Sequence, residues 1–292
     1  MKLGVFAKTF ASDSIGANLD AVQAHGFGCT QYNLVCAGLP TLPDEIDLET
    51  CQRIRDAHRD RNLTMAAISG TFNIIDPDRE RLRANMRRLR VLVQAAPQMG
   101  TGVITLCAGT RDAENMWRSH PENDSPEAWR EMTASIRRIV TIVEGSDITV
   151  AVEPEVNNVV DTAAKARQLL DEVGSSHLKV VFDAANLFHH GQLSAMHEIL
   201  DEAIDAVGPD IVIAHAKDLS HDGDAGHEAA GTGLLDYDYY LKLLAKVGFD
   251  GPLIAHGLSE DQAGQCARFL QGKMKTLQHS TDGPSADRKG SA

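Results

Sequence analysis

Residues 148–153 read Ile-Thr-Val-Ala-Val-Glu, a short run of apolar and β-branched side chains that ends in a carboxylate. Continuous apolar runs of this length are typical of parallel strands that are buried on both faces. Further runs of the same kind occur along the chain, and an amphipathic segment follows each of them. The eight predicted strands are Leu3–Ala7, Gly28–Leu34, Leu63–Ile68, Gly102–Cys107, Ile148–Glu153, Leu178–Asp183, Ile211–His215 and Pro252–His256.

The amphipathic segments between these runs are predicted to be helices. Their ends carry the usual signals, because Pro126 takes a first helical position and glycines such as Gly100 and Gly174 follow the last helical residues. Strict alternation of strand and helix through eight units favours a closed barrel, and an open doubly wound sheet is the main alternative. The predicted helices are Ser14–His25, Leu48–Arg61, Arg79–Met99, Pro126–Glu144, Thr162–Gly174, Leu193–Val207, Tyr237–Val247 and Ser259–Leu277.

The predicted fold class is α/β, a single (β/α)₈ TIM barrel that spans residues 1–278. Such barrels usually have about 250 residues, which is close to the length of this segment. Residues 279–292 are rich in Gly, Ser, Asp and Pro without apolar periodicity, so we expect a disordered C-terminal tail there. The first strand is not followed by a GxGxxG motif and the chain has no Walker loop, so it lacks a strong nucleotide signal.

Composition limits the partners and the compartment of the protein. The chain carries 41 Asp and Glu against 28 Lys and Arg, a net charge of −13 that repels phosphate backbones and anionic membrane surfaces. Its five scattered cysteines form no CxxC pair, which argues against disulfides and suits a reducing cytoplasm. No apolar stretch approaches the roughly 18 residues that span a bilayer. We therefore expect a cytoplasmic protein that binds neither nucleic acid nor membranes.

The last four predicted strands end on side chains that can ligate a metal. Barrel enzymes place their chemistry at the C-terminal ends of strands, and these strands end on Glu153, Asp183, His215 and His256. Taken singly, each residue is more often a helix cap, a supporting polar group or a satisfied core residue. Together, two carboxylates and two histidines at one rim need a cation to offset their charge and desolvation. The sequence therefore predicts a metal site at this rim.

The predicted donor atoms are nitrogen and oxygen, without sulfur. Imidazole suits zinc, iron and cobalt, whereas carboxylates also suit manganese. We therefore expect one divalent metal ion, which is Mn, Zn, Fe or Co rather than calcium.

Four short motifs that include these residues resemble a known family. They are Val-Ala-Val-Glu-Pro at 150–154, Phe-Asp-Ala-Ala-Asn at 182–186, His-Ala-Lys-Asp at 215–218 and Gly-Pro-Leu-Ile-Ala-His at 251–256. They are similar to the xylose-isomerase-like TIM barrel superfamily, which includes sugar phosphate isomerases and epimerases. The resemblance covers residues 1–275 in element order. It implies a metal-dependent barrel that acts on a small-molecule polyol or sugar.

In the ketose 3-epimerase branch of this family, the ligand order is Glu, Asp, His and Glu, and the two glutamates act as acid and base. Glu153, Asp183 and His215 match this order, but His256 stands where the second glutamate is expected. The resemblance then implies that Glu153 removes a proton next to a carbonyl, through a metal-stabilised enediolate. The second proton has to come from another group. Lys217 is the predicted catalytic partner, with His189 or a bound water as the alternatives.

Further polar residues near the strand ends are candidate substrate contacts. The long loop after the fourth strand carries Trp117, whose face suits a sugar ring, and Arg111, which can pair with an acidic group. The alternative for this loop is that the tryptophan only packs it down and the arginine is solvated. Asn186 and His189 follow the sixth strand, and Glu155 lies two residues beyond the fifth. Residues two apart on an extended chain point to the same side, so Glu155 is predicted to face the site.

The leading prediction is a metal-dependent isomerase or epimerase of a sugar, keto-sugar or cyclitol. A lyase or dehydratase on the same substrates is the alternative, and His256 in place of a second glutamate favours it. An endonuclease IV-like hydrolase is less favoured, because the second and third strands end near Asn33 and Ser69 without the histidines that further zinc ions need. A sugar-binding barrel without catalysis is the third class. Barrels of this group often pair, so a homodimer is one expectation, and the sequence leaves the oligomeric state open.

Overall fold

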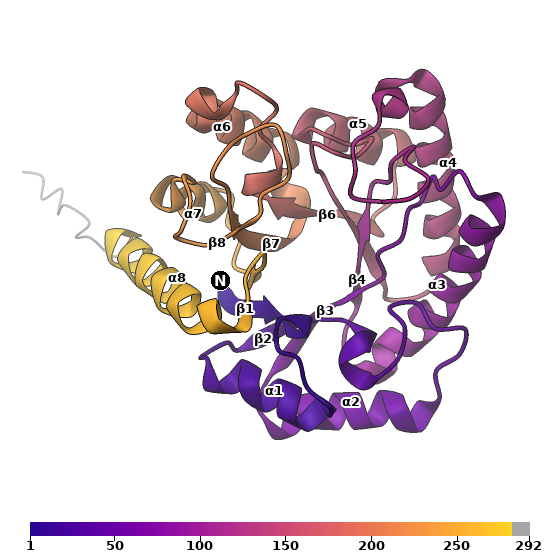
Figure 1. Cartoon of the computed structure of the whole chain (residues 1–292), viewed down its shortest axis with the longest axis horizontal. Coiled ribbons are helices and arrows are strands. Elements are labelled where there is room, and N and C mark those ends of the chain that lie inside the picture. Colours follow the sequence, from indigo (N-terminus) through magenta and orange to yellow (C-terminus); the bar gives the residue numbers. More distant parts are fainter. Residues whose placement is uncertain (282–292) are drawn as a thin grey trace, which may run out of the picture.

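Eight parallel strands form a closed barrel in the computed structural model, which describes residues 1–281 of the chain (Figure 1). Each strand pairs with its neighbours in chain order, and the pairings β6–β7, β7–β9 and β9–β1 close the ring. The strands are β1 (Lys2–Phe6), β2 (Cys29–Tyr32), β3 (Thr64–Ser69), β4 (Val103–Cys107), β5 (Thr149–Glu153), β6 (Leu178–Asp183), β7 (Ile211–Asp218) and β9 (Pro252–Ala255). The predicted single (β/α)₈ barrel is therefore confirmed.

Helices surround the barrel on its outside (Figure 1). Several of them begin where the sequence predicts, because Asp47, Ser125 and Thr162 accept a hydrogen bond from a backbone N–H three residues on. Within the described residues, no helix combines the length and the apolar character that crossing a membrane requires. The helices are α1 (Ile15–Ala24), α2 (Leu48–Asp60), α3 (Arg79–Met99), α4 (Pro126–Val143), α5 (Ala163–Val173), α6 (Met196–Val207), α7 (Tyr237–Lys246) and α8 (Glu260–Thr281).

The C-terminal boundary predicted at residue 278 lies inside α8, which continues to Thr281. The remainder of the predicted disordered tail, residues 282–292, lies outside the described residues.

The seventh barrel strand is longer than the sequence predicts. β7 continues beyond His215 to Asp218, so the predicted end at His215 is wrong. Beyond the rim of the barrel, a short strand, β8 (Glu228–Ala229), pairs antiparallel with β7 and sets Lys217 opposite Ala229. The loop after β7 thus returns to supply the backbone hydrogen bonds that the extension needs. Lys217 is consequently held on a strand and not on a free loop.

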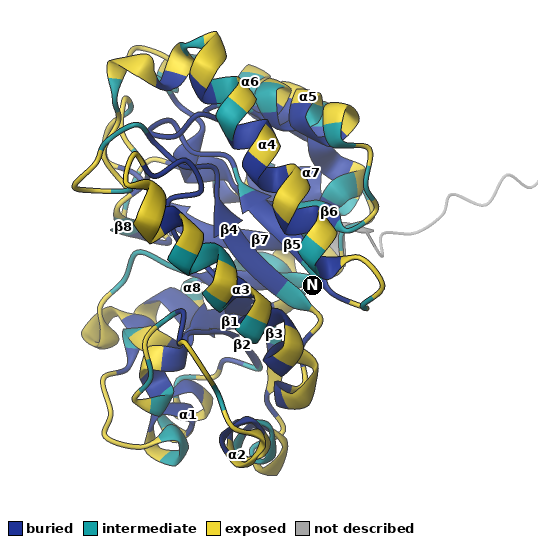
Figure 2. Cartoon of the chain, turned by 90° about the vertical axis from the view of Figure 1, so that its right-hand side faces the viewer, coloured by how far each residue is buried: buried dark blue, intermediate teal, exposed yellow. Residues whose placement is uncertain are grey.

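The barrel strands are largely buried, whereas the helices alternate buried and exposed residues (Figure 2). The buried side chains form a large cluster between the barrel and its helices and a second, smaller cluster in the interior of the barrel. The inner cluster consists mostly of small side chains, and the backbones around it approach closely. At Gly4 on β1, for example, a Cβ atom would lie 2.5 Å from the Cys29 sulfur. The tightly packed cluster therefore closes the interior of the barrel. Polar groups gather beyond it, at the C-terminal ends of the strands.

One buried histidine on a helix outside the barrel makes the stability of the fold depend on pH. His58 on α2 is 3% exposed, and its Nδ1 lies 2.8 Å from the Ile54 carbonyl oxygen while its Nε2 lies 3.1 Å from the Thr30 hydroxyl. Burial lowers the pKa of His58 from 6.5 to about 4, so the folded protein keeps this ring neutral at mildly acidic pH. The unfolded chain takes up the proton at its ordinary pKa.

We expect the contribution of the neutral, buried His58 to the free energy of unfolding to be fully present above pH 6.5. This contribution should be lost as the pH falls towards 4. Between pH 7 and pH 5 the loss should be about 2 kcal/mol of unfolding free energy. Urea unfolding at both pH values measures it, and His58→Gln should reduce the difference by that amount. His190→Gln is the control, because the His190 side chain is 96% exposed. An unchanged pH dependence in His58→Gln would contradict the assignment.

Candidate active site

The four predicted metal ligands converge at the C-terminal rim of the barrel. The register between β6 and β7 sets Asp183 opposite His215, and the register between β7 and β9 sets His215 opposite Ile254, two residues before His256. One donor atom from each of Asp183, His215 and His256 lies within 4.8 Å of the others. Glu153 ends β5, and its Oε1 lies 3.3 Å from His215 Nδ1. The strand ends therefore bring together all four residues that the sequence singles out.

Two atoms of this group are buried without a hydrogen-bond partner among the described residues. They are Oδ2 of Asp183 and Nδ1 of His256. The other carboxylate oxygen of Asp183 accepts the Ala185 N–H at 3.1 Å, and Lys217 Nζ lies 3.3 Å from Oδ2. Oδ2 of Asp183 thus has ionic contacts but no hydrogen bond, and coordination to a cation would satisfy both this atom and Nδ1 of His256. The donor set of carboxylates and imidazoles therefore fits a divalent metal.

A hydrogen-bond chain orients His215 for ligation. Its Nε2 lies 2.8 Å from Gln31 Oε1, and the Gln31 amide nitrogen in turn donates to the Thr105 hydroxyl at 3.0 Å. Because the amide oxygen can only accept, His215 must carry its proton on Nε2 when neutral. The lone pair of Nδ1 then faces Glu153 and Asp183, as metal ligation requires. The sequence prediction missed Gln31, although a glutamine inside the buried strand β2 was a usable signal.

The Glu153 carboxylate is held by Asn186. The Asn186 amide nitrogen donates to Glu153 Oε1 at 2.8 Å, and its oxygen accepts the Gly226 N–H at 3.0 Å. Asn186 is fully buried. The structure thus places this residue, which was predicted as a substrate contact, against the Glu153 carboxylate.

The charges of the cluster are coupled. Burial by itself would raise the pKa of Asp183, but the Lys217 ammonium and His215 outweigh it and hold that pKa well below its usual range. Burial would likewise lower the pKa of His215, but the Glu153 and Asp183 carboxylates raise it to about 9. Without a metal, this imidazole is therefore the proton-bearing partner of the buried Asp183 carboxylate and the largely covered Glu153 carboxylate.

Two further groups of the site are neutral near pH 7. Burial, reinforced by the neighbouring charges of Lys217 and His215, lowers the pKa of His256 well below its usual range. Burial and the nearby Glu153 carboxylate raise the pKa of Glu155 to about 8. A neutral His256 is in the form that binds a metal without first losing a proton.

A cavity of 470 Å³ opens above the cluster at the barrel mouth. Glu153, Glu155, Lys217 and His256 all contribute to its wall, and Trp117 covers it from the loop after β4 with a side chain that is 48% exposed. Ligand pockets in proteins usually have volumes of about 300–1,000 Å³, so this cavity is large enough for a sugar.

Two predicted substrate contacts do not line this cavity. Arg111 forms an ion pair with Glu131 on α4, with Nη1 2.9 Å from Oε2, and its side chain is only 14% exposed. His189 lies with Nε2 3.7 Å from Asp161 Oδ2. The structure therefore places Arg111 in a contact between a loop and α4, and His189 in a contact between two loops, outside the lining of the cavity.

The family is shown by comparison with known proteins. The model of the xylose isomerase-like TIM barrel family matches residues 19–272, so the chain belongs to that family. The resemblance that the strand-end motifs predict is thus confirmed. A ketose 3-epimerase of Arthrobacter globiformis is 21% identical over 268 residues, which cover 89% of this chain and 84% of that protein.

Solved structures show the same fold. A D-tagatose 3-epimerase-like protein has a TM-score of 0.75 at 16% identity, with 96% of this chain and 100% of that chain covered. A xylose isomerase domain protein from Planctomyces limnophilus has a TM-score of 0.72 at 18% identity, with 95% and 97% covered. At such identities the likeness concerns the barrel fold.

We expect His256→Ala to weaken metal binding by about tenfold or more, because it removes one of the two imidazole donors. Thermal unfolding measured over a Mn²⁺ or Co²⁺ titration reports the affinity, since an ion that binds only the folded state raises the Tm. His190→Ala, at an exposed position, should leave the titration unchanged. Equal titration curves for wild type and His256→Ala would show that His256 is not a ligand.

Proposed function

We propose that the chain is a metal-dependent epimerase or isomerase of ketoses. The observation that carries the proposal is the Glu153 carboxylate, which Asn186 holds in the cavity wall 3.3 Å from the candidate ligand His215. A carboxylate fixed at the edge of a sugar-sized cavity suits a general base. The similarity to a ketose 3-epimerase supports the same reaction class.

A divalent cation bound by Glu153, Asp183, His215 and His256 would act as a Lewis acid towards neighbouring carbonyl and hydroxyl oxygens of the substrate. Glu153 removes the proton from the carbon next to the carbonyl, and this proton moves to its carboxylate. The electron pair of the broken C–H bond forms a carbon–carbon double bond, and the carbonyl electrons move to oxygen, which gives an enediolate.

Lys217 is the proposed donor of the second proton. Its ammonium lines the same cavity, and although burial would lower its pKa, the carboxylates of Asp183 and Glu153 raise it, so the group is charged at neutral pH. A proton that returns to carbon from Lys217 inverts the carbon, whereas a proton that returns from Glu153 restores the substrate. Exchange with water then resets both groups. Glu155, buried in the wall of the cavity, is proposed to hydrogen-bond a substrate hydroxyl.

Glu153→Gln should slow substrate C–H exchange by about 10²–10⁴-fold, because an amide cannot accept the proton. Proton NMR in deuterated water, with a panel of ketoses, measures the exchange. The metal titration described above should show that the variant still binds Mn²⁺. Glu122→Gln, at an exposed position, is the matched control. Full exchange in Glu153→Gln would exclude this residue as the base.

Lys217→Met should separate the two proton transfers. We expect formation of the epimer to fall by about 10²-fold or more, while deuterium still enters at the reacting carbon through Glu153. Lys246→Met is the control, because the Lys246 side chain is 60% exposed on α7. If both rates fall equally, or neither falls, Lys217 does not supply the second proton.

A further inference from the structure

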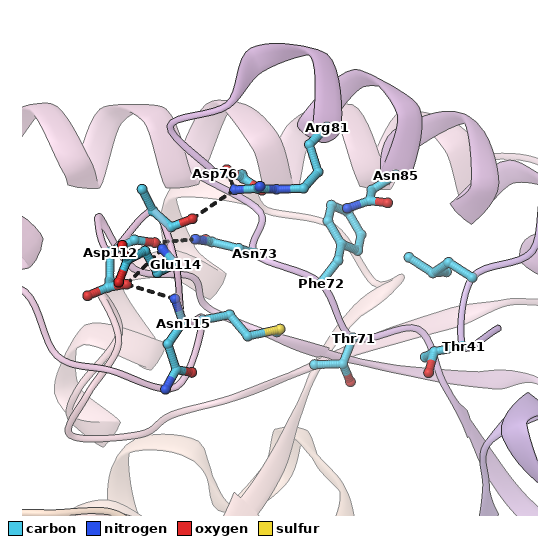
Figure 3. Close-up of a pocket in the computed structure, with 13 residues that line it drawn as sticks. Thr41, Thr71, Phe72, Asn73, Asp76, Arg81, Asn85, Asp112, Glu114 and Asn115 are labelled. Atoms are coloured by element: carbon cyan, nitrogen blue, oxygen red, sulfur yellow. Dashed lines mark hydrogen bonds and ion pairs between the residues drawn. The ribbon is translucent and has the colours of Figure 1, made fainter.

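A second cavity, of 430 Å³, adjoins the one above the metal ligands (Figure 3). Thr41, Thr71 and Met116 line both cavities, so the two spaces meet along a shared wall. Each has the volume of an ordinary ligand pocket, about 300–1,000 Å³. We call the second space the side cavity. It is defined by the loops after β2, β3 and β4 and by the first turns of α3.

Side chains hold these loops together around the side cavity. Asn73, in the loop after β3, donates to the Thr110 carbonyl oxygen at 2.8 Å and accepts the Thr110 N–H at 3.1 Å. Arg81, at the start of α3, donates to Asp76 at 2.6 Å and to the Ala113 carbonyl oxygen at 3.0 Å. Figure 3 shows Arg81 beside Asp76 at one end of the cavity. These contacts fix the walls of the side cavity in place.

The lining of the side cavity suits a neutral polyol. Arg81 is the one cationic side chain among the described residues that line the cavity. Its guanidinium already donates hydrogen bonds to Asp76 and to the Ala113 carbonyl oxygen. Asp112 and Glu114 add carboxylates, which Arg118 contacts from outside the lining at 3.2 and 3.5 Å. A phosphate ester would therefore meet carboxylates and no free cation.

Hydroxyl groups, in contrast, would find both donors and acceptors in this cavity. Asn85 and Asn115 contribute amides, and Thr41 and Thr71 contribute hydroxyls beside the apolar side chain of Phe72 (Figure 3). Such a mixture of a few polar groups and apolar surface is typical of pockets that bind uncharged polar ligands.

We propose that the side cavity binds a second, neutral sugar unit, so that the preferred substrate is a ketose that carries a glycosyl group. This inference rests on the proposed function, because it places the reacting ketose unit above the metal ligands and the attached unit across Thr41, Thr71 and Met116. Free ketoses would occupy only the first cavity. Phosphorylated ketoses would be poor substrates.

The test compares D-fructose with isomaltulose, maltulose and lactulose, three disaccharides that carry a free C3 on their fructose unit, and with fructose 6-phosphate. Loss of the C3 proton in deuterated water gives kcat/KM for each. We expect at least one disaccharide to exceed D-fructose by about tenfold, and fructose 6-phosphate to fall below it.

Two variants test whether the preference for disaccharides arises in the side cavity. Ala113→Trp adds bulk to the side cavity and should lower the disaccharide advantage by about tenfold while D-fructose changes less than about threefold. Ser119→Trp, on the same loop but outside both linings, is the matched control. Asn85→Leu removes an amide without filling the space and should also reduce the advantage. D-fructose turnover reports whether each variant keeps an intact first cavity.

The outcomes are distinct. If D-fructose reacts as well as every disaccharide, or if Ala113→Trp lowers all substrates equally, the side cavity does not bind a second sugar unit and the proposed function stands. If wild type exchanges no proton with any ketose, the proposed function fails and this inference fails with it.

Discussion

Backbone hydrogen bonds between the last parallel strands determine where the chemistry of this protein lies. The register sets Glu153 opposite Cys107, Asp183 opposite His215, and His215 opposite Ile254. Because successive side chains of a strand point to opposite faces, a shift of one residue in any pairing would turn a ligand out of the barrel. The site therefore depends on barrel closure, and closure depends on the apolar runs that fill both faces of each strand.

Burial makes these same residues interdependent. Asp183, with no exposed side-chain surface, is held ionised by Lys217 and His215, and His215 is held in place by Gln31 from the other side of the barrel. Removal of one partner would leave another charge buried and uncompensated, which costs more than the pair itself contributes. The site is thus one network in which no candidate ligand has an independent environment, and a cation would complete it.

Strand runs and strand-end residues could be predicted from the sequence because both follow from local periodicity and the geometry of a barrel. The contacts that support the strand-end residues could not be predicted from the sequence. Asn123 accepts the backbone N–H of Arg111 at 2.8 Å and shapes its loop, and the Arg111 side chain pairs with Glu131. Contacts of this kind join residues far apart in the sequence and leave no periodic pattern in it. Asn186 follows β6 as a ligand would, and only the three-dimensional fold shows that it supports Glu153. The β8 strand is too short to leave a pattern.

The paired hydrogen bonds between Asn73 and Thr110 have a consequence for how such a barrel diverges. They couple the loops after β3 and β4, so a change in the length of one loop would disturb the other. The candidate metal ligands lie on other elements, on β5, β6 and β7 and directly after β9. Related barrels would therefore be expected to vary these two loops together, while the strands that carry the candidate ligands keep their geometry.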